Sequence, residues 1–509
     1  MKRSRPNILM IMADQLPARC LSAYGHPVIK TPNLDALAAR GVLFQSAYAN
    51  CPICAPSRAS MCAGRYVSAI GAFDNGADFP SSVPTFMHQL RHADYEVILS
   101  GKMHFLGPDQ LHGFERRVTP EIYPANFSWT ADWTRGAHHN PGTAVDQLRD
   151  AGLCDWNLQL DYDEETGFRA LEALRDCARR QDEGRPFFLC ASFTHPHDPF
   201  ITTRRWWDLY RHDEIQMPTA PALPIEEMHA YNQWLQIHHM IDVFPPADQH
   251  VRNSLHAFYG MVSYFDHKVG QLVDELEQLG LARNTVVVVT SDHGEMLGEH
   301  GMWFKRTFFE PSVGVPLVIA GTEHIRCGQR VAEAVSLVDL FPTFVELSGR
   351  DDWREVESQV DGQSLCALLR GEERKRAQGA VSEYYSEGVC QPMRLAVIDR
   401  LKYVYVHKEE PLLFDLDQDP NEMNNCLADP SYVDRFEPLK HLVHDDWDPK
   451  EMRRRVLDSQ RRRQLIHEAM AHGRDESWDV EPHIDASQQY VRHKNAQATN
   501  VDMRYPRTD

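Results

Sequence analysis

The sequence predicts an α/β fold, in which a large, mostly parallel sheet is flanked by helices on both faces. Short apolar runs of strand length recur through the first 320 residues, and helical patterns lie between several of them. Two acidic sites directly follow predicted strands. Strands separated by helices are typical of mostly parallel sheets, in which functional residues gather beyond the carboxyl ends of the strands.

The elements follow in order. The first predicted strand covers residues 7–13 and ends at Asp14. Thr31 and Pro32 predict the start of a helix, with Thr31 as N-cap and proline at the first helical position. Further strands are predicted over residues 95–99, 187–193, 285–290 and 316–320, and a helix over 258–279. The string Ser291-Asp292-His293-Gly294 follows one of these strands directly.

The pattern changes after Leu369. Residues 394–397, 402–406 and 412–416 predict short antiparallel strands, and two polar helices follow them. The last stretch shows little periodicity. We therefore predict a main α/β unit over residues 1–369, a smaller α+β unit over 370–474 and an extended tail over 475–509.

The composition excludes several classes of protein. A net charge of −20 argues against a nucleic-acid partner, and no apolar run approaches the roughly 20 residues of a membrane span. The apolar stretch after Pro6 soon meets Asp14, which is too short for a secretory signal and favours a cytoplasmic protein. The 11 scattered cysteines favour reduced thiols over a disulfide framework.

The string Cys54-Ala55-Pro56-Ser57-Arg58, followed by Gly64-Arg65, carries the strongest functional signal. It resembles the signature of type I sulfatases, members of the alkaline phosphatase superfamily in which this cysteine is oxidised to formylglycine. Cys51 and Cys54 also form a Cys-x-x-Cys pair, which is compatible with a redox or zinc site. No second cysteine pair with metal-ligand spacing occurs in the sequence, which disfavours that alternative.

The resemblance implies a covalent mechanism. One hydroxyl of the hydrated formylglycine attacks sulfur in line and releases the alcohol; the other then loses its proton, and sulfate leaves by C–O cleavage. Pro56 suits the first turn of a helix whose N-terminus favours an anion. Arg58 can hold the diol or a sulfate oxygen through its planar guanidinium.

The resemblance also implies one divalent cation. Asp14, Asp292 and His293 would bind it together with the oxygen of the modified Cys54. Oxygen ligands with one imidazole favour Ca²⁺ or Mn²⁺ over Mg²⁺. Many sulfatases have a second aspartate after the first; Gln15 stands there, and we do not count it as a ligand.

Five further residues match the family's catalytic set in order and approximate spacing. Asn75 would orient the second hydroxyl, Lys102 and His104 would bind sulfate and assist proton transfer, and His197 would protonate the leaving group. Lys305 stands at the family's second sulfate-binding lysine.

Among sulfatases, the chain most resembles the choline sulfatases. The strings that carry this resemblance are SGKMHFLGPDQLHGF (100–114), IYPANFSW (122–129), SFTHPHDPF (192–200), WFKRTFFE (303–310) and RYPR (504–507). Trp129 and Glu387 match residues that face the choline ammonium there. Residues 133–155 depart from that family, and Gln497 stands where it has an aspartate that serves a neighbouring subunit.

The predicted function is hydrolysis of a small sulfate monoester, with choline-O-sulfate as one candidate. Alternatives are an arylsulfatase, a phosphonate monoester or phosphodiester hydrolase, several of which share the Asp14-Gln15 pair, and a non-catalytic oxyanion-binding protein with unconverted Cys54. A formylglycine-generating enzyme is the implied protein partner. The tail, with Tyr490 and Tyr505, predicts a homo-oligomer, a tetramer before a dimer.

Overall fold

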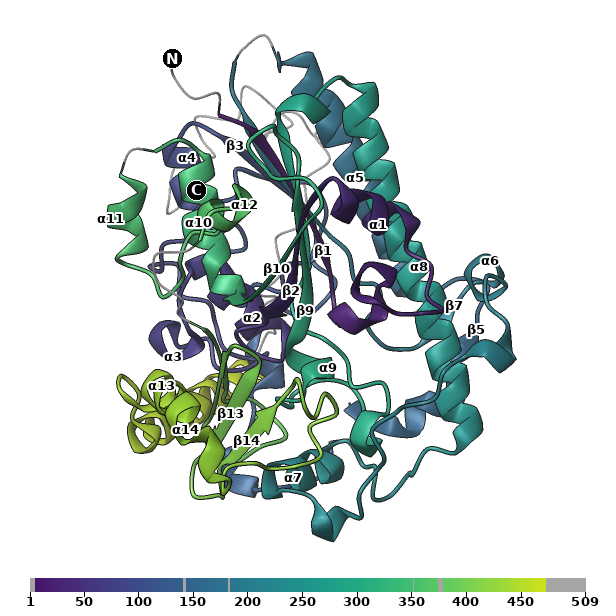
Figure 1. The fold of residues 1–509 in the computed structure, drawn as a ribbon, viewed down its shortest axis with the longest axis vertical. Coiled ribbons are helices and arrows are strands. Elements are labelled where there is room, and N and C mark those ends of the chain that lie inside the picture. Colours follow the sequence, from purple (N-terminus) through teal and green to yellow (C-terminus); the bar gives the residue numbers. More distant parts are fainter. Residues whose placement is uncertain (1–4, 141–142, 182–183, 351, 374–378, 473–509) are drawn as a thin grey trace, which may run out of the picture.

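The structure, a computed structural model, describes residues 5–472 apart from 141–142, 182–183, 351 and 374–378. An eight-stranded sheet forms the centre of these residues, and a four-stranded antiparallel sheet packs at one end (Figure 1). The predicted tail, residues 475–509, lies outside the described residues.

The large sheet is mostly parallel, as predicted. Among its described strands, β9 alone runs antiparallel to its neighbours β2 and β8. The strands lie in the order β10 (Gln329–Ser336), β2 (Gly41–Tyr48), β9 (Gly314–Ala320), β8 (Thr285–Ser291), β1 (Asn7–Ala13), β6 (Phe187–Ser192), β3 (Glu96–Gly101) and β4 (Arg116–Arg117).

Helices cover both faces of this sheet because β1 is apolar on both sides. Ile8 and Met10 face a core built with α2, α4 and α10, whereas Leu9 and Ile11 face one built with α1, α5 and α8. These helices are α1 (Pro32–Ala39), α2 (Cys54–Ala63), α4 (Phe86–His92), α5 (Leu158–Arg179), α8 (Asp248–Gln278) and α10 (Leu340–Leu347).

The start of α1 differs in detail from the prediction. Thr31 is the N-cap residue and Pro32 opens the helix, but the Thr31 side chain makes no capping hydrogen bond. Asp266, on α8, instead accepts hydrogen bonds from the backbone nitrogens of Asn33 at 3.2 Å and Leu34 at 2.8 Å. A carboxylate from another helix thus satisfies the first free N–H groups of α1.

The small sheet lies near the carboxyl ends of β1 and β8 (Figure 1). Helix α13 packs on one of its faces through Leu439 and Val443, and α14 packs on the other through Met452 and Val456. Its elements are β11 (Ala380–Tyr384), β12 (Met393–Ile398), β13 (Leu401–Val406), β14 (Leu412–Asp415), α13 (Val433–His444) and α14 (Pro449–Met470). The domain boundaries at residues 369 and 474 stay a prediction.

Two further properties bear on the class of protein. No helix of the described residues has the length and apolar character that crossing a membrane requires. All eleven cysteines lie within the described residues, and none of them forms a disulfide.

Candidate active site

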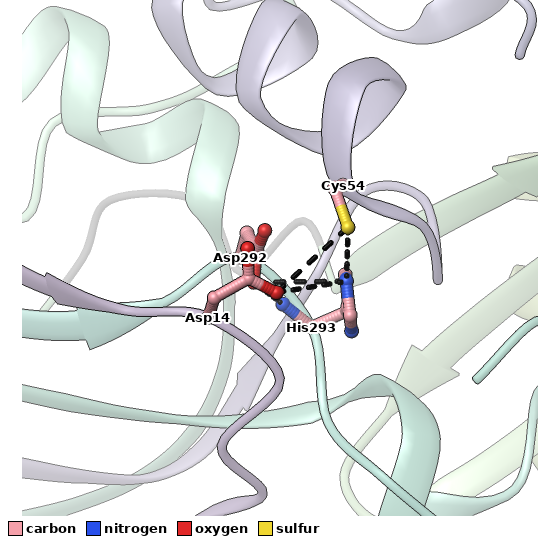
Figure 2. A group of neighbouring side chains, drawn as sticks. All are labelled: Asp14, Cys54, Asp292 and His293. Atoms are coloured by element: carbon pink, nitrogen blue, oxygen red, sulfur yellow. Dashed lines mark hydrogen bonds and ion pairs between the residues drawn. The ribbon is translucent and has the colours of Figure 1, made fainter. Parts of the chain in front are cut away.

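The strand ends bring four potential ligands together. Strands β1 and β8 pair in parallel with Ala13 opposite Ser291, so the next residues, Asp14 and Asp292, leave the sheet side by side. Helix α2 begins at Cys54 above them (Figure 2). The ligand atoms of Asp14, Cys54, Asp292 and His293 all lie within 4.8 Å of one another, and all four residues are buried.

Arg58, one turn along α2 from Cys54, fixes the orientation of both carboxylates. Its Nε donates to Asp292 Oδ2 at 2.7 Å, and its Nη2 donates to Asp14 Oδ2 at 3.2 Å. The other oxygens face the cluster: Asp14 Oδ1 lies 3.8 Å from Cys54 Sγ, and Asp292 Oδ1 lies 3.7 Å from His293 Nε2. The guanidinium therefore binds the outer oxygens and turns the inner oxygens toward the cluster.

The His293 ring is oriented as a ligand. Its Nδ1 lies 2.9 Å from the Gly294 carbonyl oxygen, a contact in which the nitrogen must donate. The lone pair therefore resides on Nε2, which lies 3.2 Å from Cys54 Sγ. Two carboxylates and an imidazole held in this tautomer fit a divalent cation.

Cationic side chains surround the Cys54 sulfur. Burial raises the pKa of this thiol, but Lys102, Lys305 and His293 outweigh burial and hold it well below its ordinary value. Lys102 also donates to Asp14 Oδ2, and its ammonium lies 4.1 Å from the centre of the Tyr123 ring. This end of the site is thus built to hold an anion.

Lys305 and His197 form a second polar group beside Cys54. Lys305 Nζ lies 2.7 Å from His197 Nε2 and also donates to Gln15 Oε1. His197 Nδ1 lies 2.6 Å from the carbonyl oxygen of Asp198, so Nδ1 donates and Nε2 faces Lys305. The His197 ring nitrogen that lacks a hydrogen is therefore next to the Lys305 ammonium.

Asn75 and His104 line the cavity beside Cys54 and come from other loops. Asn75 Oδ1 accepts the backbone N–H of Ala55 at 3.1 Å, which ties its loop to the first turn of α2. Both ring nitrogens of His104 are buried, and the ring interacts with the side chain of Cys54. Burial lowers the pKa of His104, so the ring is neutral and can accept a proton.

A cavity of about 850 Å³ opens from this cluster. Cys54, Asn75, His104, His197 and Lys305 line it together with Trp129 and Glu387, so the predicted catalytic and substrate-binding residues meet in one space. Trp129 is 41% exposed and stands edge-on to the His104 ring, with centroids 5.7 Å apart. Asp14, Arg58, Lys102, Asp292 and His293 are buried behind them.

Glu387 has a partner that the sequence did not reveal. Its Oε1 accepts hydrogen bonds from Arg306 Nη2 at 2.8 Å and Nε at 3.2 Å, and its Oε2 accepts one from Ser386 Oγ. Arg306 is buried, with 3% of its surface exposed. The carboxylate is thus neutralised within the protein.

Gln15 and Tyr123 also belong to the site but were given no role from the sequence. Gln15 donates its backbone N–H to Asp292 and its amide to Asp198, and it accepts from Lys305. The sequence signal that could have identified Gln15 was its position directly after Asp14. The Tyr123 hydroxyl lies 3.5 Å from His197 Nδ1, and no spacing rule points to it.

Comparisons with known proteins agree with this geometry. The family model for Sulfatase matches residues 6–350, that for the N-sulphoglucosamine sulphohydrolase C-terminal region matches 298–467, and that for the choline sulfatase C terminus matches 454–502. The chain is 38% identical to the choline-sulfatase of Rhizobium meliloti, with both chains covered to 100%. It is 27% identical to an arylsulfatase of Clostridium perfringens, over 88% of this chain and 95% of that one.

A solved structure extends the comparison to the fold. The phosphonate monoester hydrolase of Agrobacterium radiobacter superposes with a TM-score of 0.67 at 26% identity, covering 86% of this chain and 95% of that chain. The predicted fold class is confirmed. The Sulfatase model matches more than half of the chain, and the full-length relative exceeds 30% identity. The chain therefore belongs to the sulfatase family, and it is a sulfuric ester hydrolase.

Proposed function

We propose that the protein hydrolyses a small sulfate monoester through a formylglycine derived from Cys54 and one divalent cation. The observation that carries this proposal is the place of Cys54. It is the first residue of α2 and lies within 4.8 Å of three metal-ligating groups. The sulfur stands for the formylglycine oxygens, which would occupy the same place.

Asp14, Asp292 and His293 would hold the cation, with an oxygen of modified residue 54 as a further ligand. Such a cation acidifies a hydroxyl and stabilises charge that develops on the sulfuryl oxygens. Ca²⁺ and Mn²⁺ are the first candidates, because the ligands are oxygens and a single imidazole.

The chain's own groups bind and orient the sulfate. Lys102 and Lys305 offer ammonium groups near Cys54, and the N-terminus of α2 adds backbone N–H groups. These donors are preorganised, because Lys102 is fixed by Asp14 and Lys305 by Gln15. Arg58 keeps the carboxylates in place and does not need to touch the substrate.

Two histidines would move protons. His197, whose Nδ1–H is fixed by the Asp198 carbonyl, would act in its doubly protonated form and donate the Nε2 proton to the departing alcohol once sulfate has engaged Lys305. His104, buried and neutral beside Cys54, would take the proton of the second hydroxyl. Asn75, tied to Ala55, would orient that hydroxyl.

Choline-O-sulfate is the first alkyl ester to test, because the 38% identical relative is a choline-sulfatase. An aryl sulfate and a phosphonate monoester complete the comparison, since relatives of both activities match the chain. We expect higher kcat/KM for sulfate esters than for the phosphonate. The reverse order would assign the site to phosphonate hydrolysis.

A non-catalytic oxyanion-binding protein is the alternative of another class. Mass spectrometry of the peptide that contains residue 54 separates the two, because oxidation of the thiol to an aldehyde changes the peptide mass. Protein produced together with a formylglycine-generating enzyme should carry the aldehyde and turn over sulfate esters. Full conversion without turnover of any ester would refute the proposed function.

A further inference from the structure

Helix α5 holds the loop that carries His197. This loop follows β6 and includes residues 194–199, while Gln159 and Asp163 lie in the first two turns of α5. Residues four positions apart lie on one face of a helix, so both side chains can reach the same loop. Both are buried, Gln159 with 8% and Asp163 with 0% of its surface exposed.

Asp163 binds the beginning of the loop with both carboxylate oxygens. Oδ1 accepts the backbone N–H of Thr194 at 2.7 Å and the Thr194 hydroxyl at 3.0 Å. Oδ2 accepts the backbone N–H of His195 at 2.9 Å and its ring Nδ1–H at 2.7 Å. The Thr194 carbonyl oxygen in turn accepts the backbone N–H of His197 at 2.9 Å. One carboxylate therefore fixes the turn in which His197 lies.

Gln159 binds the other end of the loop. Its Nε2 donates to the carbonyl oxygen of Asp198 at 2.7 Å, and the same oxygen accepts the Nδ1–H of His197 at 2.6 Å. A carbonyl oxygen has two lone pairs and can accept both hydrogens. Gln159 thus fixes the acceptor that holds the His197 ring, and the direction of Nε2 follows from that contact.

We infer that Asp163 and Gln159 are positioning residues for the proton donor and act on the reaction through His197. The inference rests on the proposed function and explains how its leaving-group acid is held in place. A general acid is effective only when its proton lies within hydrogen-bond reach of the departing oxygen. Loops are more mobile than the helices and strands that they connect, and the contacts with α5 restrict this one at both ends.

The donors around Asp163 suggest two variants of different severity. The four groups that bind its carboxylate all donate hydrogens. Asparagine has nearly the same shape, but its amide nitrogen would face two of these donors and accept from neither. Asp163→Asn should therefore displace the loop. Gln159→Met removes a single donor and leaves the contacts of Asp163 intact.

A series of aryl sulfates tests the inference in protein produced together with a formylglycine-generating enzyme. The p-methylphenyl, phenyl and p-nitrophenyl esters have similar shapes, but p-nitrophenolate leaves readily without a proton. Gln159→Met should lower kcat/KM for p-methylphenyl sulfate by about tenfold and Asp163→Asn by about a hundredfold, against less than about threefold for p-nitrophenyl sulfate. Equal losses across the series indicate a merely structural role and would overturn the inference.

The His197→Ala background shows whether the two residues act through His197. In that background, Gln159→Met should change kcat/KM for p-methylphenyl sulfate by less than about twofold. A further tenfold loss, of about the size seen with His197 present, would contradict the assignment. Asp161→Asn is the matched control and should behave like the wild type, because Asp161 lies on the same helix and is exposed, with Trp156 Nε1 as its donor.

Two results separate this inference from the proposed function. Turnover of p-nitrophenyl sulfate by the wild type reports sulfatase chemistry, so equal losses in an active protein refute the inference alone. Crystal structures of the wild type and the two variants require no turnover, and the His197 ring should leave its wild-type position in both variants. Gln159→Met decides the matter by itself if Asp163→Asn does not fold. An unmoved ring would refute the inference even if no ester is hydrolysed.

Discussion

Arg463 on α14 forms a bidentate ion pair with Asp74, with 2.7 Å from each donor nitrogen to its carboxylate oxygen, although the two residues are 389 positions apart. The same guanidinium donates to Thr130 Oγ1 at 2.9 Å. Asp74 precedes Asn75, and Thr130 follows Trp129, so one side chain ties together two loops of the cavity. A Cβ at Gly76 would lie 2.3 Å from the Thr130 nitrogen, which shows how closely these loops approach.

Arg463→Lys should lower kcat/KM by about tenfold or more, because lysine keeps the charge but cannot form the two parallel hydrogen bonds. Arg463→Met leaves Asp74 unpaired in a buried place and should cost about 3–5 kcal/mol of stability. Arg461→Lys is the control, since Arg461 lies on the same helix with 77% of its side chain exposed. Lost stability at unchanged kcat/KM would restrict Arg463 to a structural role.

Cys54→Ala should abolish turnover and leave the thermal unfolding transition close to wild type, because the substitution removes the nucleophile and buries no new polar group. Turnover of p-nitrophenyl sulfate and circular dichroism measure the two effects. Cys54→Ser should also be inactive in a host whose modifying enzyme accepts only cysteine. Near wild-type activity in Cys54→Ala would rule out the covalent mechanism.

Removal of the divalent cation should lower kcat by two or more orders of magnitude, because charge stabilisation worth several kcal/mol is lost. Asp14→Ala and Asp292→Ala should reproduce this loss, and elemental analysis should find less than one bound ion per chain. Asp213→Ala is a suitable control, since its carboxylate pairs with Arg211 on the surface. Full activity in metal-free protein would contradict the assignment of the ligands.

The stability of the protein should fall as the pH is lowered from about 6.5 to about 4, and His26 should contribute to this fall. Burial, and then Arg19, lower the pKa of His26 from 6.5 to about 4. Its Nδ1 accepts the backbone N–H groups of Val28 at 3.2 Å and Ile29 at 3.0 Å, which a proton would displace. In this pH range the unfolded chain binds the proton and the folded chain does not, so acid favours unfolding.

His26→Asn tests this sign directly, because asparagine retains an acceptor for the turn but does not titrate. Urea unfolding at pH 7.5 and pH 5 should show a smaller difference in free energy for the variant than for the wild type. An equal difference in the two proteins would show that His26 is not among the responsible groups.

Deletion of the residues after Asp475 should reduce the mass per particle measured by light scattering and weaken substrate binding. This expectation comes from the composition of the tail, whose few apolar side chains offer little surface for burial on a single protomer. The match of the choline sulfatase C-terminal model to residues 454–502 supports a specific role. A truncated protein with unchanged particle mass and unchanged KM would contradict the predicted oligomer.

The parts of the fold that could be predicted are those with a local signal. Strands β1 and β8 are continuous apolar runs, and both were predicted within a residue of their observed bounds. Strand β10 was missed because its sequence, QRVAEAVS, mixes polar residues into a strand at the edge of the sheet. Strand β2 was missed because Gln45 and Ser46 interrupt its apolar run.

The residues of the candidate site also differ in whether they have a local sequence signal. Asp14, Cys54 and Asp292 follow strands or begin a helix, so motif and position together predicted them. Arg306 and Arg463 could not be assigned, because their roles depend on partners 81 and 389 positions away. Sequence spacing contains no information on which loop a distant helix will meet.

Because Arg463 lies far after Asp74 and Thr130 in the sequence, its contacts with them form late in protein synthesis. The chain emerges from the ribosome from its N-terminus, so Asp14, Cys54, Asp292 and His293 exist well before α14 does. A nascent chain of 300 residues therefore holds every proposed metal ligand, yet it lacks the Arg463 side chain that joins Asp74 to Thr130. The enzyme should become competent only when almost all of its sequence has been translated, which spares the cell a partly made hydrolase.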